Sequence, residues 1–133
     1  MTREIKFRGQ NIDTGEWVYG GVAFADDRVS IIHKSGNNLM QHTMVVPETV
    51  GQLTGLKDKN GIDIYEGDVV VKYGSGSKQG VEVDRGIVKW FNHESCFSFD
   101  KNGTWNLGIY SKHGENTLEV IGNIHEHPHL LVK

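Results

Sequence analysis

The 133-residue sequence has little cysteine, little proline and no long apolar run. Cys96 is the single cysteine, so neither an internal disulfide nor a multi-cysteine zinc site can form, which agrees with a reducing compartment. No segment approaches the ~20 consecutive apolar residues that a membrane-spanning helix needs, and the first residues do not lead into an apolar signal core. We therefore expect a cytoplasmic protein that does not enter a membrane.

An excess of basic residues is also missing. The chain carries 17 acidic residues against 14 basic ones, for a formal charge of -3. A nucleic-acid partner would then have to be attracted by a local basic patch, because the molecule as a whole has no positive field. The length fits one domain of ordinary size with a core of its own.

Strong helix formers are scarce as well. Ala, Leu and Met total 12 residues, whereas Val, Ile, Thr, Phe, Trp and Tyr total 43, and 17 glycines suit turns. This balance predicts a mainly β fold. Alternation of apolar and polar residues predicts about nine short strands, which is typical of a small barrel or sandwich: residues 4–8, 16–24, 29–33, 39–46, 69–71, 81–91, 96–99, 104–109 and 118–124.

Turns and breaks in this pattern are predicted from glycine, proline and asparagine. Pro47 starts one short helical turn over residues 47–50. Bulges are expected at Gly20–Gly21 and, where the apolar face changes, near Gly86. The tetrapeptide Asp-Lys-Asn-Gly occurs at 58–61 and again at 100–103, and Asn-Gly is a strong signal for a hairpin turn. The second copy would pair residues 96–99 with 104–109.

Three motifs with possible chemistry have simpler structural interpretations. The glycine-rich loop 74–80 lacks the spacing of a phosphate-binding loop, so we expect a plain strand connection and no nucleotide. His125, His127 and His129 alternate and would project ~7 Å apart from one side of an extended tail, where zinc or nickel could bind, but a solvated tail is the default interpretation. Cys96 and His93 have no fixed geometry relative to each other, so we do not expect a thiolate pair. From the three motifs together we expect no catalytic residues, no metal and no cofactor.

Positive charge gathers in two places. The first cluster lies on one face of the first strand, and the second surrounds the glycine-rich loop. Tyr19, Tyr73 or Trp105 near them could stack bases, as small barrels do with single strands. An edge strand protected by Lys and Arg explains the same charges without any ligand. The candidate nucleic-acid-binding residues are Arg3, Lys6, Arg8, Lys72, Lys78, Arg85 and Lys89.

Six sequence blocks, spread in order along the chain, together carry a family resemblance: Arg3–Gly9, Gly15–Gly20, Val46–Gln52, Thr54–Gly61, Ile64–Val70 and Glu119–Ile124. The chain resembles the YopX family of phage and prophage proteins. The resemblance implies a phage or prophage origin in a bacterial host and a mainly β fold related to small SH3-like barrels, and it implies no catalytic residue. A Tyr, an Asn and an acidic residue are more usual in the family at His125, His127 and His129, which weakens the metal hypothesis.

The family motif is mainly architectural in physical terms. Pro47 starts the helical turn, Asn60 is expected in the left-handed region, and Asp68 is expected to cap the turn before Val69. Gly55, Gly61 and Gly67 supply backbone freedom. Turn geometry does not require Tyr65 or Glu66, so these two are the candidate surface contacts.

We therefore expect a small SH3-like barrel or roll over residues 47–126, with an N-terminal β extension over 1–46 and a tail over 127–133. The expected function is a non-enzymatic interaction module that binds a protein partner or itself during phage growth or lysogeny. An accessory nucleic-acid-binding protein is the alternative. An unrecognised metal-dependent enzyme is the second alternative.

Overall fold

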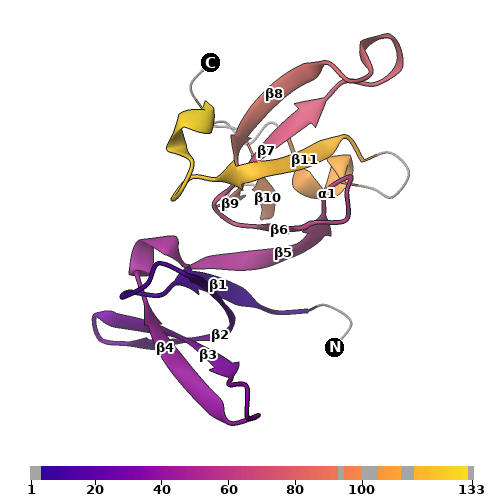
Figure 1. Cartoon of the computed structure of the whole chain (residues 1–133). Helices are drawn as coiled ribbons and strands as arrows, with labels where there is room; N and C mark the ends of the chain where they lie inside the picture. The colour runs from indigo at the N-terminus through magenta and orange to yellow at the C-terminus, as the bar shows by residue number, and fades with distance from the viewer. Residues whose placement is uncertain (1–3, 93–94, 100–104, 112–115, 132–133) are drawn as a thin grey trace. The chain divides into compact units, whose positions relative to one another are not determined.

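A computed structural model describes residues 4–92, 95–99, 105–111 and 116–131 (Figure 1). Antiparallel strands dominate it, with one short α-helix and three short 3-10 turns in the described part, so the prediction of a mainly β fold is confirmed. The chain divides into two compact units, Met1–Leu53 and Thr54–Lys133. The division falls inside one strand, β5 (Gly51–Lys57), which begins in the first unit and ends in the second.

The first unit is an antiparallel sheet in the strand order β4-β3-β2-β1-β5. Strands β1 to β4 agree with the predicted ones within a few residues, whereas β5 was not predicted as a strand. The turn η1 (Pro47–Thr49) forms where Pro47 predicted it. Alternation along these strands places Val29, Ile31 and Val45 in a core that Phe7, Val18, Val22 and Val50 flank. The strands before β5 are β1 (Phe7–Gln10), β2 (Trp17–Ala25), β3 (Arg28–Lys34) and β4 (Met40–Val45).

The sheet of the first unit curls back on itself. The segment after β1 meets the end of β4, where the Ile12 amide donates to the Met44 carbonyl at 3.0 Å and the Val46 amide donates to the Gln10 carbonyl at 2.9 Å. The Gln10 amide also donates to Thr49 Oγ1 at 2.9 Å. The segment that the sequence predicted as an extension therefore has a rolled sheet and a core of its own.

Gly20 shows why two glycines stand in the middle of β2. The pairing of β2 with β1 runs through Gly20 and its pairing with β3 begins at Gly21, without a shift of register, so the predicted bulge at Gly20–Gly21 is wrong. A Cβ atom at Gly20 would lie 2.0 Å from the Ile32 carbonyl oxygen, whereas one at Gly21 would meet nothing within 4 Å. Close approach of β3, and not a bulge, requires glycine at position 20.

The second unit contains three groups of paired strands. A three-stranded sheet has the order β11-β7-β8, a small hairpin joins β9 and β10, and the end of β5 pairs with β6. Strand pairing in the described residues therefore does not close into the predicted barrel. The strands are β6 (Asp63–Tyr65), β7 (Asp68–Tyr73), β8 (Glu82–Ile87), β9 (Lys89–Phe91), β10 (Cys96–Ser98) and β11 (Leu118–Asn123).

The core of the second unit collects apolar side chains from most of these strands. Phe99, Leu107 and Leu118 are fully buried in it together with Ile64, Val70 and Val88. Trp105 and Tyr110 pack at its margin, with their rings 5.2 Å apart and nearly perpendicular. Three helical segments complete the unit: η2 (Gly76–Lys78), α1 (Leu107–Tyr110) and η3 (Pro128–Leu131).

Two predicted strands of this unit are wrong in part. The long strand over 81–91 is two strands, β8 and β9, separated by the buried Val88, and the register shift against β7 lies near Val83 instead of Gly86. Asn106 forms an antiparallel bridge with Ser98, as the predicted pairing requires, but from Leu107 onward the predicted strand over 104–109 is replaced by α1. Asn106 Oδ1 accepts a hydrogen bond from the Ile109 amide and caps the helix start. Residues 100–104, with the second Asn-Gly turn, lie outside the described residues.

Candidate functional site

The loop over residues 58–61 is organised by the carboxylate of Asp58. Asp58 is 4% exposed, and its Oδ1 accepts hydrogen bonds from the amides of Asn60, at 2.8 Å, and Ile62, at 2.9 Å. Its Oδ2 accepts from the amide of Val120 in β11 at 3.0 Å. Gly61 has a φ of 81°, whereas Asn60 is not among the described residues with positive φ. The predicted left-handed conformation therefore belongs to Gly61 and not to Asn60.

The second motif turn, Tyr65–Asp68, is built in the same way. Asp68 is buried, and its Oδ2 accepts from the Tyr65 amide at 2.8 Å, so it caps the turn before Val69 as predicted. Gly67 has a φ of 91° and Gly55 a φ of 83°, which favour glycine at both positions. Tyr65 is 5% exposed and belongs to the core side of this turn, so its prediction as a surface contact is wrong; Glu66 is half-buried.

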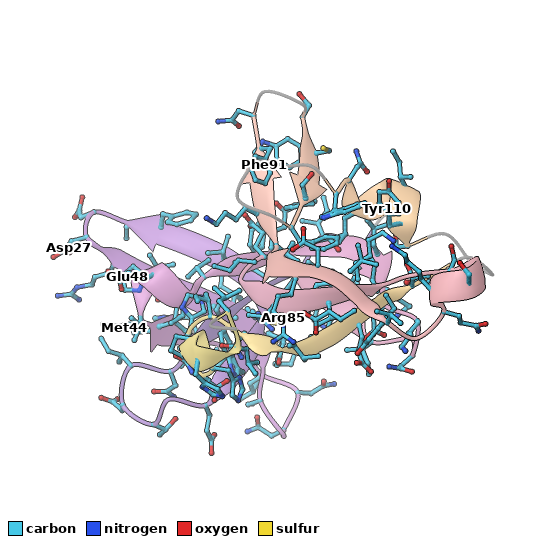
Figure 2. All side chains as sticks on the ribbon, turned by 90° about the horizontal axis from the view of Figure 1, so that it is seen from above. Asp27, Met44, Glu48, Arg85, Phe91 and Tyr110 are labelled. Atoms are coloured by element: carbon cyan, nitrogen blue, oxygen red, sulfur yellow. The ribbon has the colours of Figure 1, made fainter. Side chains whose placement is uncertain are left out.

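The second basic cluster does not form one patch. Lys72 stands opposite Asp84 in the β7–β8 pairing and Arg85 stands opposite Val71, so the two side chains lie on opposite faces of the sheet. The Arg85 guanidinium donates to both carboxylate oxygens of Glu82, at 2.7 and 2.5 Å, and to the Leu130 carbonyl at 2.6 Å, beside the C-terminal turn (Figure 2). Lys78 lies in η2, and Lys89 is exposed on β9.

The first basic cluster is used within its own sheet. The Arg8 guanidinium is buried and lies over the Trp17 ring, with its carbon 4.4 Å from the ring centroid. The Lys6 ammonium lies over the Tyr19 ring at 5.7 Å. Arg3 lies outside the described residues. Because Arg8 is packed under the sheet's own aromatic side chain, this cluster offers little positive charge to a ligand.

The histidine tail is folded and not extended. Asn123 Oδ1 accepts from the amides of His125, at 3.1 Å, and Glu126, at 2.9 Å, which makes a tight turn after β11. His127 Nδ1 accepts from the Asn123 amide at 3.3 Å, and His129 lies in η3. The prediction of three histidines in a row on one side is therefore wrong. Within the described ranges, no group of three or more His, Cys, Asp or Glu side chains is placed to hold a metal ion.

Two hollows lie next to each other in the second unit, and Asn116 lines both. The first, of about 690 Å³, is lined by Lys57, Asp58 and Lys59 with Gly55, Leu56, Gly61 and Ser111. The second, of about 590 Å³, is lined by Lys72, Tyr110 and Thr117 with residues 74–76 and Gln79. Asn116 Nδ2 donates to the Lys57 carbonyl at 2.7 Å, and its Oδ1 accepts from the Leu118 amide at 2.9 Å, which fixes the residue between them.

Lysines and aromatic rings meet at these hollows. The Lys72 ammonium lies 5.1 Å from the centroid of Trp105 and 4.9 Å from that of Tyr110. The Lys59 ammonium lies 4.4 Å from the Tyr73 centroid, and the Tyr73 hydroxyl donates to Glu119 Oε1 at 2.8 Å. That hydrogen bond, with smaller contributions from burial and from the charge of Glu119, raises the pKa of Tyr73 above its usual 10.0.

The first unit has exposed apolar side chains on β2, β3 and β4 and just before β4. Phe24 is 72% exposed, Met40 is 62% exposed, and Ile32, Leu39 and Met44 are exposed as well. Ile32, Met40 and Met44 share the outer face of the sheet, because the pairing places Ile32 opposite His42, Lys34 opposite Met40 and Ser30 opposite Met44. β4 is also the last strand in the sheet order.

Sequence reasoning selected Lys72 as a candidate binding residue and Gly55 and Gly61 as turn residues. It missed Lys57, Lys59, Tyr110 and Asn116 as lining residues. Lys57 and Lys59 flank Asp58 in a motif whose glycines and asparagine indicate turn formation. The motif was therefore interpreted as architectural, and its two lysines were not included among the basic clusters. Tyr110 follows the wrongly predicted strand 104–109. Asn116 carries no pattern in the sequence, because its role depends on the folding together of β5, α1 and β11.

Comparison with known proteins places the chain in a protein family. The family model described as YopX protein matches residues 6–132, and the chain therefore belongs to the YopX family. A solved structure, the crystal structure of protein EF1440 from Enterococcus faecalis, has a TM-score of 0.60 and 22% sequence identity over 98% of this chain and 99% of that chain, which supports the fold. Among proteins with curated descriptions, none matches. The described part of the chain also contains no helix long and apolar enough to cross a membrane.

Proposed function

We propose that the protein is a non-enzymatic interaction module, encoded by a phage or prophage and acting in the bacterial cytoplasm, that binds a second copy of itself through β4. The observation that carries the proposal is the edge of β4. Residues 44–46 of that edge are bonded to Gln10 and Ile12, whereas in the described part of the chain no backbone bond covers the outer side of residues 40–43. We also propose that the fold of the second unit is related to small SH3-like barrels.

The composition of β4 supports strand addition at this edge. Its sequence, Met-Gln-His-Thr-Met-Val, contains none of the Lys, Asp, Glu or Pro residues that commonly protect a sheet edge from pairing. Met40 and Met44 of β4 lie on its outer face and are exposed, so a second strand would cover apolar surface as well as form backbone hydrogen bonds. An antiparallel copy of β4 presents the same surface and gives a closed two-fold pair.

The contacts of the ionisable side chains described above support a structural and not a catalytic role for these side chains. Asp58 and Asp68 are held by backbone amides, Glu82 is paired with Arg85, and Glu119 accepts from Tyr73. His127, which the metal-dependent enzyme hypothesis would need, accepts a hydrogen bond that holds the C-terminal turn. These bonds engage the groups that an acid, a base or a metal ligand would use.

Sedimentation of the full chain over a range of concentrations tests the proposal. We expect a monomer–dimer equilibrium that the double substitution Met40→Lys with His42→Lys shifts to monomer, because it places four like charges beside the shared edge. The matched control is Phe24→Lys, which removes a more exposed apolar side chain away from that edge and should leave the dimer unchanged. A wild-type chain that stays monomeric at its solubility limit would overturn the proposal.

Cross-linking supplies an independent readout of the same edge. In a Cys96→Ser background, Gln41→Cys should form a disulfide-linked dimer under mild oxidation, because the middle of the free edge of one copy would lie beside that of the other. Cysteine at the exposed Lys34 on the neighbouring strand is the control and should cross-link much more slowly. Equal rates for the two variants would mean random collision and would contradict pairing through β4.

A further inference from the structure

We propose that the two hollows on either side of Asn116 form a binding track for single-stranded nucleic acid, named here the Asn116 track. Its defining residues are Lys57, Lys59, Lys72, Tyr110 and Asn116. The track lies in the second unit, whereas the proposed self-association uses β4 of the first unit, so each can fail without the other.

Charge is the first argument. Residues 54–133 contain nine Lys or Arg and eleven Asp or Glu, a formal charge of −2. The lining of the two hollows reverses that balance, with three lysines and one carboxylate, Asp58. Both oxygens of Asp58 accept hydrogen bonds from backbone amides. With Asp63, the ion-pair partner of Lys57, counted as well, the track has three lysines and two carboxylates on a negative unit, which favours a polyanion over a neutral or cationic ligand.

The position of Lys72 is the second argument. Two aromatic rings at nearly a right angle hold its ammonium, and it donates one hydrogen bond, of 3.3 Å, to the Tyr73 carbonyl. Within the described residues its ammonium makes no salt bridge to a carboxylate. An ammonium has three N–H donors, so the rings fix its place and leave donors for a phosphate oxygen.

The remaining lining suits a nucleotide chain. Ser75, Gln79, Thr117 and Asn116 carry hydroxyl or amide groups that can bond phosphate, sugar or base edges, and Tyr110 supplies an aromatic ring at the second hollow. Each hollow falls within the ~300–1,000 Å³ of ordinary ligand sites. Two such hollows joined at one residue fit consecutive units of a strand better than one isolated nucleotide.

The structure moves the nucleic-acid hypothesis away from most of the residues that the sequence selected. Arg85 is bound to Glu82 and to the Leu130 carbonyl on the other face of the sheet, and Lys89 is not part of either lining. Lys57 is paired with Asp63 at 2.6 Å, but both side chains are well exposed, and such pairs contribute about 0–1 kcal/mol and can exchange for phosphate.

Fluorescence anisotropy with a labelled oligothymidylate tests the track. We expect the triple substitution Lys57→Gln, Lys59→Gln, Lys72→Gln to weaken binding at least tenfold and to lower the slope of log affinity against log salt by about 2, since each phosphate contact on a single strand contributes about 0.7. The matched control removes three exposed cations elsewhere, Arg28→Gln, Lys34→Gln and Lys89→Gln, and should change affinity less than about twofold.

Equal losses in the two triple variants would mean non-specific attraction and would overturn the track, as would a wild-type chain that does not bind the oligonucleotide. Lys72 contributes to packing, so thermal melting must show that the track variant is folded; the double variant Lys57→Gln, Lys59→Gln leaves Lys72 in place and should still weaken binding severalfold.

Tyr110→Leu should reduce affinity without changing the salt slope. Thymidine monophosphate that competes as well as the oligonucleotide, or a duplex that binds equally, would contradict a single-strand site.

Discussion

Asp58 and Val120 are 62 residues apart in the sequence, and the Val120 amide donates to Asp58 Oδ2 at 3.0 Å. The neighbouring Lys59 amide donates to the Leu118 carbonyl at 2.8 Å. β11 is the end strand of its sheet, and its register against β7 shifts just after Val120. The loop over residues 58–61 thus replaces a partner strand for β11 at the point where regular pairing is interrupted.

Substitution of Asp58 should destabilise the fold. Asp58→Ala leaves three backbone amides without an acceptor, in a place with little access to water, and we expect a loss of about 3 kcal/mol in the free energy of unfolding. Urea denaturation measures it. Asp63→Ala, which removes only an exposed ion pair, is the control and should cost less than about 1 kcal/mol. Equal effects would show that the Asp58 network does not stabilise the fold.

The two adjacent glycines of β2 should respond differently to the same change. Gly20→Ala forces a methyl group against the Ile32 carbonyl, so β3 must move, and we expect a loss of about 2 kcal/mol or more. Gly21→Ala meets open space and should be neutral or stabilise by about 0.5 kcal/mol, because alanine loses less backbone entropy on folding. Thermal unfolding of the pair distinguishes them. If Gly21→Ala were the more harmful change, the register of β2 and β3 would be wrong.

Tyr73 should titrate at higher pH than an ordinary tyrosine. The hydrogen bond to Glu119 favours the neutral phenol, so the pKa of Tyr73 is raised above 10.0 in the folded chain. The resulting stabilisation is complete below pH 10.0 and is lost as the pH rises through the folded pKa, because the unfolded chain releases the proton first. Tyrosinate absorbance of the wild type minus that of Tyr73→Phe isolates the group. Glu119→Gln should lower this pKa; an unchanged titration would contradict the assigned cause.

Arg85 should hold the C-terminal turn against β8. Arg85→Ala removes the donor to the Leu130 carbonyl and leaves Glu82 without its guanidinium partner. We expect amide hydrogen exchange at His127 and Leu130 to quicken roughly tenfold, since a hydrogen bond to a charged group contributes about 1.5–3 kcal/mol. Lys89→Ala is the control. Unchanged exchange in the Arg85 variant would mean that the turn is held by β11 alone.

Much of the first unit could be predicted from the sequence. The alternation of apolar and polar residues predicted the bounds of β2, β3 and β4 to within one residue, because one face of each strand packs around Ile31 and the other face does not. What alternation could not show is the hydrogen bonding of Gln10 and Ile12 to the end of β4, which depends on how strongly the sheet curls.

The second unit was harder to predict, because single side chains override local patterns there. Asn106 caps the first turn of α1 in a β-like sequence. The Asn-Gly pair correctly indicated the hairpin between β5 and β6, but not that the Asp58 carboxylate organises its loop. Lys72 was selected from its charge, but the other residues of the Asn116 track come from β5, the loop over residues 58–61, α1 and the segment before β11. No periodicity along the chain brings these segments together.

β5 has a consequence for how this protein can be divided. Gly51 and Gln52 pair with Arg8 and Phe7, and Thr54, two residues later, donates its hydroxyl to the Ile64 carbonyl. No linker separates the two compact units, so a cut at their boundary severs a hydrogen-bonded strand and leaves each half with an unfinished edge. The family model spans both units in the same way. A truncation at residue 53 or 54 would therefore cut through β5 and not through a linker.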